Sequence, residues 1–353
     1  MKTHFRNVIG LMSGTSLDGI DLTLVQFDKN DVSKFKILHA DTISYSKKWK
    51  KTLQNAIAFS DEKLKDLDIE YGNLLADEIN HFIKKNEIIN IEFIASHGHT
   101  ILHQPENGIT LQIGNGQVIS DKTKQKTVCD FRTQDVDFGG QGAPLVPIGD
   151  ELLFRNYDAC LNLGGFANVS FKVEKTRVAF DICPVNIVLN YYVNKLGFDY
   201  DNKGEIAATG KINNDLLEEL NALEFYQKKS PKSLGLEWVQ KHIYPMIDYH
   251  DLKTEDVLRT FVEHVAIQIA KSVGNKKNIF ITGGGVFNSF LIERIKEHSI
   301  AEIIVPNSEI INYKEALIFA FLGMLRVDNQ VNCLKSVTGA NKDHSSGKIF
   351  TPK

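Results

Sequence analysis

The stretch NVIGLMSGTSLDGIDLTLVQF, residues 7–27, contains two apolar runs that are separated by a short polar turn. Residues 8–12 and 20–27 have the composition of strands, and residues 35–45 add a third apolar run of the same kind. Because a short turn joins the first two strands, they are expected to pair as a hairpin. The chain is therefore predicted to begin with an antiparallel meander.

The composition limits the classes of protein to which this chain can belong. The chain has 353 residues, 42% of them hydrophobic, which is enough for two globular domains. With 41 Lys and Arg against 44 Asp and Glu, the net charge of -3 provides no broad basic surface for nucleic acid or anionic lipid. The four cysteines are far apart, and no apolar run has the length of a membrane span or the pattern of a signal peptide. We expect a soluble cytoplasmic protein with buried thiols and a small-molecule partner.

The middle of the chain repeats the opening pattern. An apolar residue at every third or fourth position predicts a helix across residues 62–86, and IEFIASHGHT (91–100) is predicted to be a strand that ends in a polar loop. The segment ACLNLGGFANVSFKV (159–173) again has the order strand, glycine turn, strand. Glycines and prolines in DFGGQGAPLVP (137–147) indicate a domain junction between the two halves. The pattern predicts a duplicated α/β architecture.

Helices and a parallel strand pair are predicted in the C-terminal half. Paired apolar residues predict a buried helix at 255–273, and NIFITGGGVFNSFLIERIKEH (278–298) has the order strand, triple glycine, helix. AEIIVP (301–306) is a further strand before a helix at 314–327, so the strand–helix–strand order predicts a parallel pair with a ligand crevice at the carboxyl end. The tail NKDHSSGKIFTPK (341–353) lacks periodicity and is expected to be frayed.

The turn GTSLDG (14–19) has features of a phosphate-binding site. Glycines let backbone amides approach an anion closely, and the hydroxyls of Thr15 and Ser16 can donate to phosphate oxygens. Asp18 would repel a bare phosphate, so we expect a divalent cation between them, as in Mg-ATP. An ordinary hairpin turn is the alternative, because turns favour the same residues. No GxxxxGK[ST] loop occurs in the chain.

Two further glycine clusters favour nucleotide binding. Gly164 and Gly165 lie in the second hairpin, and Gly283, Gly284 and Gly285 lie between a strand and a helix, whose N-terminus attracts negative charge. Three clusters so placed resemble the sugar kinase and actin superfamily. This resemblance implies an α/β, two-domain actin-like ATPase fold, which is a duplicated ribonuclease H-like fold with a central nucleotide cleft. We expect the first domain at 1–132 with about 325–353, and the second at 133–324.

Ten segments, in order along nearly the whole chain, resemble the anhydro-N-acetylmuramic acid kinase family. They are GLMSGTSLDGIDLTL, SHGHTILHQP, TLQIGNG, DFRTQDVDFGGQGAPLVP, NLGGFANVS, FDICPVN, SPKSLGLEW, ITGGGVFN, KEALIFAFL and SVTGA. The resemblance implies an enzyme that uses ATP, Mg²⁺ and water to open 1,6-anhydro-N-acetylmuramic acid from cell-wall turnover while it phosphorylates O6. The products are N-acetylmuramic acid 6-phosphate and ADP. The resemblance also implies a homodimer.

Asp181 in FDICPVN matches the catalytic aspartate of that family, and the reaction needs a general base for the water that attacks the anomeric carbon. Ile182, Cys183 and Val185 stand where the family motif FDTGPGN has Thr, Gly and Gly. The family also commonly has Phe-His where this chain has Gly149-Asp150. A kinase of the same fold that acts on a different sugar is therefore one alternative. A nucleotide-binding regulatory protein without turnover is the other, and the presence of both Asp181 and Glu315 argues against it.

The resemblance implies further site residues. Glu315 matches a second carboxylate near the substrate, with a helix-start acid as the alternative. Arg132 is expected to bind the lactyl carboxylate, with a salt bridge to Asp130 or Asp135 as the alternative. The expected substrate-binding residues are His97, Arg132, Asn168 and Asn186. The expected ATP-binding residues are Gly14, Thr15, Ser16, Leu17, Asp18, Gly19, Ile20, Asp21, Gly164, Gly165, Gly283, Gly284 and Gly285, and Asp18 is the expected Mg²⁺ ligand. A metal site at His97, His99 and His103 is disfavoured, because no carboxylate set completes it.

Overall fold

The computed structural model describes residues 4–353. The chain forms two compact units: unit 1 contains the residues up to Leu153 together with Tyr313–Lys353, and unit 2 contains Phe154–Asn312. These divisions differ from the expected ones after residues 132 and 324. Each unit has its own sheet and its own hydrophobic core.

Side-chain contacts explain why residues 133–153 and the helix before residue 325 belong to unit 1. Asp135 accepts a hydrogen bond from Thr338 at 2.7 Å, and Asp150 forms a buried ion pair with Lys314 at 2.8 Å. These partners lie 203 and 164 residues apart in sequence, so the glycine-rich stretch that suggested a junction does not indicate these contacts.

Unit 1 contains a seven-stranded sheet. Its strands are β1 (Phe5–Ser13), β2 (Ile20–Asp28), β3 (Phe35–Ile43), β4 (Phe93–Gln104), β5 (Ile109–Ile113), β6 (Thr127–Cys129) and β12 (Lys348–Phe350). The strand order is β12-β6-β4-β1-β2-β3, and β5 pairs with β4. Strands β1, β2 and β3 are antiparallel, whereas β4 runs parallel to β1, and β6 runs parallel to β4. The predicted antiparallel meander is confirmed.

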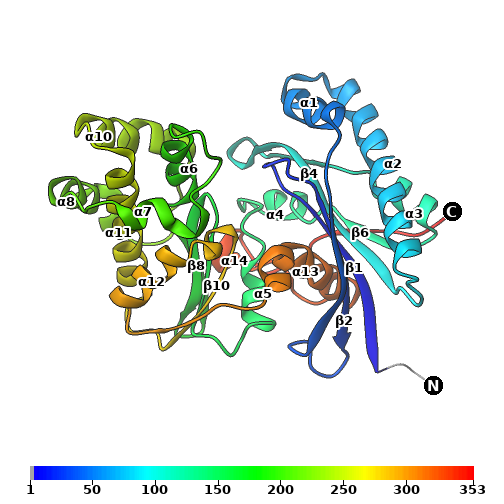
Figure 1. Cartoon of the computed structure of the whole chain (residues 1–353). Coiled ribbons are helices and arrows are strands. Elements are labelled where there is room, and N and C mark those ends of the chain that lie inside the picture. Colours follow the sequence, from blue (N-terminus) through cyan, green and yellow to red (C-terminus); the bar gives the residue numbers. More distant parts are fainter. Residues whose placement is uncertain (1–3) are drawn as a thin grey trace. The chain divides into compact units, whose positions relative to one another are not determined.

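Helices cover both faces of this sheet (Figure 1). The helices of unit 1 are α1 (Lys47–Asn55), α2 (Asp61–Lys85), α3 (Gly116–Thr123), α4 (Thr133–Asp137), α5 (Pro147–Leu152), α14 (Lys335–Thr338) and the part of α13 (Ser308–Val327) from Tyr313 onward, with short 3-10 turns η1 (Ala56–Ala58) and η2 (Pro105–Asn107). On β1, Ile9 and Leu11 pack in one core with the apolar stripe of α2. The residue between them, Gly10, faces α13, and a Cβ on it would lie 2.1 Å from the Ala316 carbonyl oxygen. The strand alternation thus places α2 and α13 on opposite faces.

Unit 2 contains a five-stranded sheet with helices packed on it. The strands are β7 (Ala159–Leu163), β8 (Phe166–Val173), β9 (Thr176–Pro184), β10 (Asn278–Thr282) and β11 (Glu302–Ile304). The helical segments are α6 (Asn186–Asn194), η3 (Asn202–Gly204), α7 (Glu205–Thr209), α8 (Asn214–Ala222), η4 (Glu224–Gln227), α9 (Leu236–Trp238), η5 (Val239–Ile243), α10 (Tyr244–Tyr249), α11 (Thr254–Val273), η6 (Gly284–Phe287) and α12 (Ser289–His298). Apolar residues of α6, α11 and α12 share one core with β7, β8 and β9.

The two sheets have the same topology. Unit 2 has the order β9-β8-β7-β10-β11, with β7, β8 and β9 antiparallel and with β7, β10 and β11 parallel. Unit 1 has the corresponding order β3-β2-β1-β4-β6. Three antiparallel strands followed by two parallel ones form the ribonuclease H-like sheet, and here it occurs twice. The predicted duplicated α/β fold is confirmed.

Two local predictions are wrong. The predicted strand at 91–100 does not end in a polar loop but continues as β4 to Gln104, because β5 folds back and supplies hydrogen-bond partners for this extension. The tail is not frayed, because β12 pairs antiparallel with β6 and Ser346 is only 1% exposed. Among residues 4–353, no helix combines the length and the apolar character needed to cross a membrane.

Candidate active site

The turn after β1 presents its polar groups to solvent. Thr15, Ser16 and Asp18 are exposed, whereas Leu17 is buried beneath them. The Leu17 N–H donates to the Gly14 carbonyl at 3.2 Å, and Leu17 has a φ of 59°, in the left-handed region that few non-glycine residues adopt. The buried leucine therefore anchors a tight turn whose two hydroxyls and one carboxylate stay free to meet a ligand.

The end of the same turn has a mainly structural role. A Cβ on Gly19 would lie 2.7 Å from the Ile43 carbonyl oxygen, so glycine is needed there for the close approach of β3. The Ile20 side chain is 1% exposed, which leaves only its backbone for an ATP contact. Asp21 accepts a hydrogen bond from Thr42 at 2.6 Å, and burial together with nearby Asp18 raises the pKa of Asp21.

A buried polar network supports this turn from below, and the sequence analysis missed it. The Ser13 hydroxyl forms hydrogen bonds with Tyr45 at 2.5 Å, with Tyr71 at 3.0 Å and with Nδ1 of His99 at 2.9 Å, and the two tyrosine hydroxyls also contact each other. Burial lowers the pKa of His99 to about 4, so the imidazole is neutral at physiological pH. The only sequence signal is His99 in the motif SHGHT.

His97 holds Arg132 in place. Nδ1 of His97 lies 3.0 Å from the Gly98 carbonyl oxygen, which only accepts, so Nδ1 carries the proton and Nε2 accepts a hydrogen bond from Arg132 Nε at 3.0 Å. Burial and the positive charge of Arg132 hold the pKa of His97 well below its usual value, which agrees with a neutral ring. Both ring nitrogens are therefore occupied, and His97 acts as a positioning residue.

Arg132 does not form the salt bridge to Asp130 or Asp135 that was the alternative interpretation. Its side chain donates to His97 and to the Gly142 carbonyl at 2.6 Å, and it forms no ion pair with any carboxylate in residues 4–353. Asp130 instead pairs with Lys348 at 2.8 Å, and Asp135 bonds to other groups. The guanidinium is partly buried and held on two sides, which suits it to bind an anionic group of a ligand.

Glu315 lies near this arginine on α13. Its side chain is exposed, yet the protein atoms around its carboxyl raise its pKa, while Arg132 and Lys314 oppose the rise. Glu315 follows two turns after the start of α13 at Ser308, so the alternative of a helix-start acid does not hold.

Asp181, on β9, is fixed by a segment from elsewhere in unit 2. Its N–H donates to the Lys232 carbonyl at 3.0 Å, and its Oδ2 accepts from the Leu234 N–H at 2.8 Å. Its Oδ1 has no hydrogen-bond partner among the described residues. Burial raises the pKa of Asp181, although the Leu234 hydrogen bond opposes this. One oxygen therefore orients the carboxylate and the other is available as a base. The Lys232–Leu234 segment lies in the motif SPKSLGLEW and is not among the expected site residues.

One expected substrate residue lies beside Asp181 in the sheet, and another follows it along the chain. Asn168 on β8 is directly opposite Asp181 in the antiparallel register, so both side chains are on the same face of the sheet. Asn168 is exposed. Asn186 begins α6, five residues after Asp181.

The glycine clusters of unit 2 surround the N-terminus of α6. The Gly165 carbonyl accepts from the Val185 N–H at 2.8 Å, and the Gly164 carbonyl accepts from the Asn186 N–H at 3.3 Å. Val185 has a φ of -131° and a ψ of -98°, which lies outside the β and right-handed α regions, at a position where the family motif has glycine. The loop of the changed FDICPVN sequence is closed by the two hydrogen bonds to the carbonyls of Gly164 and Gly165.

The triple glycine differs from the expectation in one respect. Gly283 has a φ of 88°, and a Cβ on Gly283 or Gly285 would come within 2.7 to 2.8 Å of atoms in residues 162–163. Gly284 has open space beside it. However, Gly284 and Gly285 belong to the 3-10 turn η6, and the Asn288 side chain accepts from the Leu291 N–H of α12 at 2.9 Å. The helix α12 therefore begins only at Ser289, and its N-terminus does not coincide with the glycines.

Two ribonuclease H-like units with glycine turns at corresponding hairpins define the class of actin-like kinases and ATPases. A family model for anhydro-N-acetylmuramic acid kinase matches residues 6–352. The chain belongs to the anhydro-N-acetylmuramic acid kinase family and is a kinase.

Individual relatives agree along almost their full length. The chain is 32% identical to an anhydro-N-acetylmuramic acid kinase of Sulfurimonas denitrificans, with 97% of this chain and 98% of that protein covered. It is 34% identical to one of Pasteurella multocida, with coverage of 99% and 98%. Among solved structures, the activator of 2-hydroxyisocaproyl-CoA dehydratase from Clostridium difficile has a TM-score of 0.45 at 14% identity, with coverage of 91% and 97%. Gluconate kinase from Lactobacillus acidophilus has a TM-score of 0.42 at 11% identity, with coverage of 99% and 94%.

Proposed function

We propose that this kinase uses ATP and water to convert 1,6-anhydro-N-acetylmuramic acid into N-acetylmuramic acid 6-phosphate and ADP. The observation that carries the proposal is the Asp181 carboxylate, which is oriented through Oδ2 and keeps Oδ1 available. In the reaction, a water oxygen bonds to the anomeric carbon, the bond from that carbon to O6 breaks, and O6 attacks the γ-phosphorus of ATP. Asp181 Oδ1 takes the proton of the water.

The other roles are proposed residue by residue. Arg132 binds the lactyl carboxylate, while His97 holds its guanidinium in place. Asn168 and Asn186 hydrogen-bond to the sugar, and Glu315 lies near it. ATP contacts the turn at residues 14–21 and the glycines of 164–165 and 283–285.

The exposed oxygen donors of the first turn fit a magnesium ion. The Asp18 carboxylate and the hydroxyls of Thr15 and Ser16 are the hard ligands that Mg²⁺ prefers. When bound, Mg²⁺ would supply charge neutralisation for the phosphates. Asp18 would hold it through its carboxylate.

We further propose that the protein works as a cytoplasmic homodimer in the recycling of cell-wall sugars. All four cysteines lie in the described part of the chain, where they are buried and form no disulfide, which suits a reducing compartment. Light scattering during gel filtration tests the oligomeric state, and a monomeric mass would contradict the dimer.

The product decides between this function and its alternatives. Purified protein is incubated with ATP, Mg²⁺ and 1,6-anhydro-N-acetylmuramic acid in oxygen-18-labelled water, and the product is analysed by mass spectrometry. We expect the sugar to gain one phosphate and one labelled water together. A gain of phosphate without water would indicate an ordinary hydroxyl kinase. No product from this sugar, but turnover of another anhydro sugar, would support the alternative that the altered FDICPVN motif raised. If none of these sugars is turned over, the result would support the alternative of a nucleotide-binding regulatory protein.

The proposed magnesium contact makes a separate prediction. Asp18→Asn removes one charge beside the cation, so half-maximal turnover should require about tenfold more Mg²⁺. The matched control is Asp77→Asn, which changes an exposed carboxylate on α2. An unchanged Mg²⁺ titration would assign Asp18 to turn geometry alone.

A further inference from the structure

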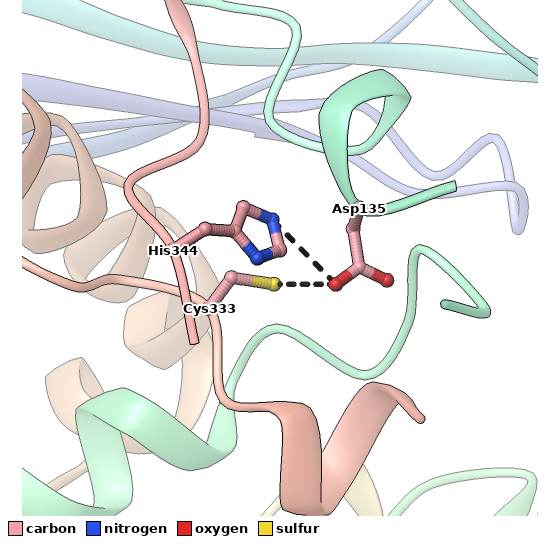
Figure 2. A group of neighbouring side chains, drawn as sticks. All are labelled: Asp135, Cys333 and His344. Carbon is pink, nitrogen blue, oxygen red and sulfur yellow. Dashed lines mark hydrogen bonds and ion pairs between the residues drawn. The ribbon is translucent and has the colours of Figure 1, made fainter. Parts of the chain in front are cut away.

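Three buried side chains from separate segments meet in unit 1 (Figure 2). Asp135 comes from α4, whereas Cys333 and His344 come from the C-terminal segment. Their side chains belong to residues that are 0%, 2% and 6% exposed. One ligand atom of each, a carboxylate oxygen, a thiol sulfur and an imidazole nitrogen, lies within 4.8 Å of the other two. None of these residues belongs to the proposed catalytic site.

The spacing of these atoms is close to that around a tetrahedral zinc ion. Asp135 Oδ1 lies 3.1 Å from Cys333 Sγ and 3.6 Å from His344 Nε2. Zinc bonds of about 2.0 to 2.3 Å at tetrahedral angles separate their ligand atoms by roughly 3.3 to 3.7 Å. The two distances from the carboxylate oxygen are therefore within a few tenths of an ångström of this range, and the sulfur and the imidazole nitrogen lie within 4.8 Å of each other.

The backbone holds two of the three residues in register. Cys333 and His344 form an antiparallel β-bridge, in which each N–H donates to the other's carbonyl at 3.1 Å. Opposed residues of this kind direct their side chains to the same face. The position of the thiol relative to the imidazole is thus set by the backbone rather than by side-chain contact.

His344 has a buried nitrogen that lacks a hydrogen bond. Its Nδ1 lies 3.2 Å from the Lys342 carbonyl oxygen and so carries a proton, which leaves the lone pair of a neutral ring on Nε2. This Nε2 has no hydrogen-bond partner among residues 4–353, and it faces the Asp135 carboxylate. A buried lone pair directed at a carboxylate is unfavourable, and either a proton or a metal cation on Nε2 removes the repulsion. The contact from Nδ1 to a carbonyl is also the outer hydrogen bond that metal-binding histidines commonly make.

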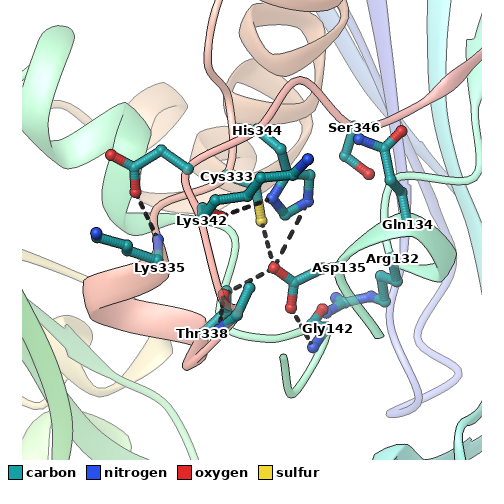
Figure 3. A network of polar contacts seen from close by, with 12 residues as sticks. Arg132, Gln134, Asp135, Gly142, Cys333, Lys335, Thr338, Lys342, His344 and Ser346 are labelled. Atoms are coloured by element: carbon teal, nitrogen blue, oxygen red, sulfur yellow. Dashed lines mark hydrogen bonds and ion pairs between the residues drawn. The ribbon is translucent and has the colours of Figure 1, made fainter. Parts of the chain in front are cut away.

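The Asp135 carboxylate is likewise oriented by hydrogen bonds from neighbouring groups (Figure 3). Asp135 Oδ2 accepts from the Gly142 N–H at 2.7 Å, and Oδ1 accepts from the Thr338 hydroxyl at 2.7 Å. These bonds fix the carboxylate before any ion arrives. The Thr338 hydroxyl or a water would complete four-coordination.

We propose that Asp135, Cys333 and His344 bind a zinc ion that fastens the C-terminal segment to α4. A set of one nitrogen, one sulfur and one oxygen suits Zn²⁺, whereas Mg²⁺ and Ca²⁺ prefer oxygen alone. On binding, a bond forms from zinc to sulfur and the thiol proton leaves to solvent. Gly142 bonds to Asp135 through its N–H and to Arg132 through its carbonyl, so the ion would also steady the loop that holds Arg132.

Metal content and a cobalt spectrum of the full-length protein test this proposal. After incubation with Zn²⁺ and gel filtration in metal-free buffer, the wild type should keep about one zinc per chain. The Co²⁺-loaded protein should show a thiolate-to-cobalt absorption band and the strong visible bands of tetrahedral cobalt. Cys333→Ala and His344→Ala should each lose most of the bound zinc, and Cys333→Ala should lose the thiolate band. Cys129→Ala, which changes another buried thiol of unit 1, is the matched control and should keep both.

Measurements on the wild type alone can contradict the proposal, so the test does not depend on the folding of any variant. A wild type that holds no zinc after gel filtration, or whose cobalt form lacks the thiolate band, contradicts the site. Zinc that persists in folded Cys333→Ala and His344→Ala, as judged by circular dichroism, would place the metal elsewhere. Chelation should also lower the melting temperature of the wild type but not that of Cys333→Ala.

Discussion

Asp181→Asn is expected to lower turnover by ~10²–10⁴-fold, the usual contribution of a positioned general base. Asparagine keeps the size of the side chain and the oxygen that accepts from Leu234, but it cannot take a proton from water. The affinity for ATP should change little, because the proposed ATP contacts lie at residues 14–21, 164–165 and 283–285. Initial rates of ADP formation and ATP binding by calorimetry measure the two effects separately.

The pH profile gives an independent check on the same residue. A base must be deprotonated to act, so turnover should rise with pH through the pKa of Asp181, which burial raises above the ordinary aspartate value. This limb should be absent in Asp181→Asn. Asp215→Asn, at an exposed position of α8, is the control and should keep both rate and profile. If Asp181→Asn retained nearly full turnover, Glu315 would become the leading candidate for the base.

Asp150→Ala is expected to destabilise the protein by about 3–5 kcal/mol, because it leaves the Lys314 ammonium buried without this carboxylate. The pair is separated by 2.8 Å, and the two residues are only 4% and 6% exposed. Urea unfolding followed by circular dichroism measures the loss. Replacing both partners, as in Asp150→Leu with Lys314→Met, should recover much of it, since both charges of the pair are then removed together.

An exposed ion pair of the same length serves as the control for that experiment. Lys122 and Asp77 also lie 2.8 Å apart, but their side chains are 37% and 65% exposed. Asp77→Ala should therefore cost less than about 1 kcal/mol. A similarly small cost for Asp150→Ala would show that the buried pair contributes no more than a surface pair.

Residues of the candidate site could be predicted only where their type and their spacing along the chain indicate a particular chemistry. The exposed hydroxyls and carboxylate at residues 14–18 and the aspartate of FDICPVN stand out in the sequence by type and spacing. Their partners do not. Nothing local links Arg132 to His97, or Asp181 to the N–H of Leu234, because these contacts form between segments that only folding brings together. The same reason explains the unforeseen cluster of Asp135, Cys333 and His344.

The sequence by itself determined the two hairpins and the duplicated α/β architecture of this protein. Alternating apolar residues and glycine turns act over a few positions, and so the hairpins at 7–27 and 159–173 and the long helices could be predicted from the pattern. Only the tertiary structure decided the length of β4, the order of the C-terminal tail and the limits of the two units. Each of these depends on backbone pairing or on a buried contact with a distant segment, such as β12 on β6 or Asp150 with Lys314. The free energy of such contacts comes from burial and pairing in the assembled fold, which no local stretch of residues contains.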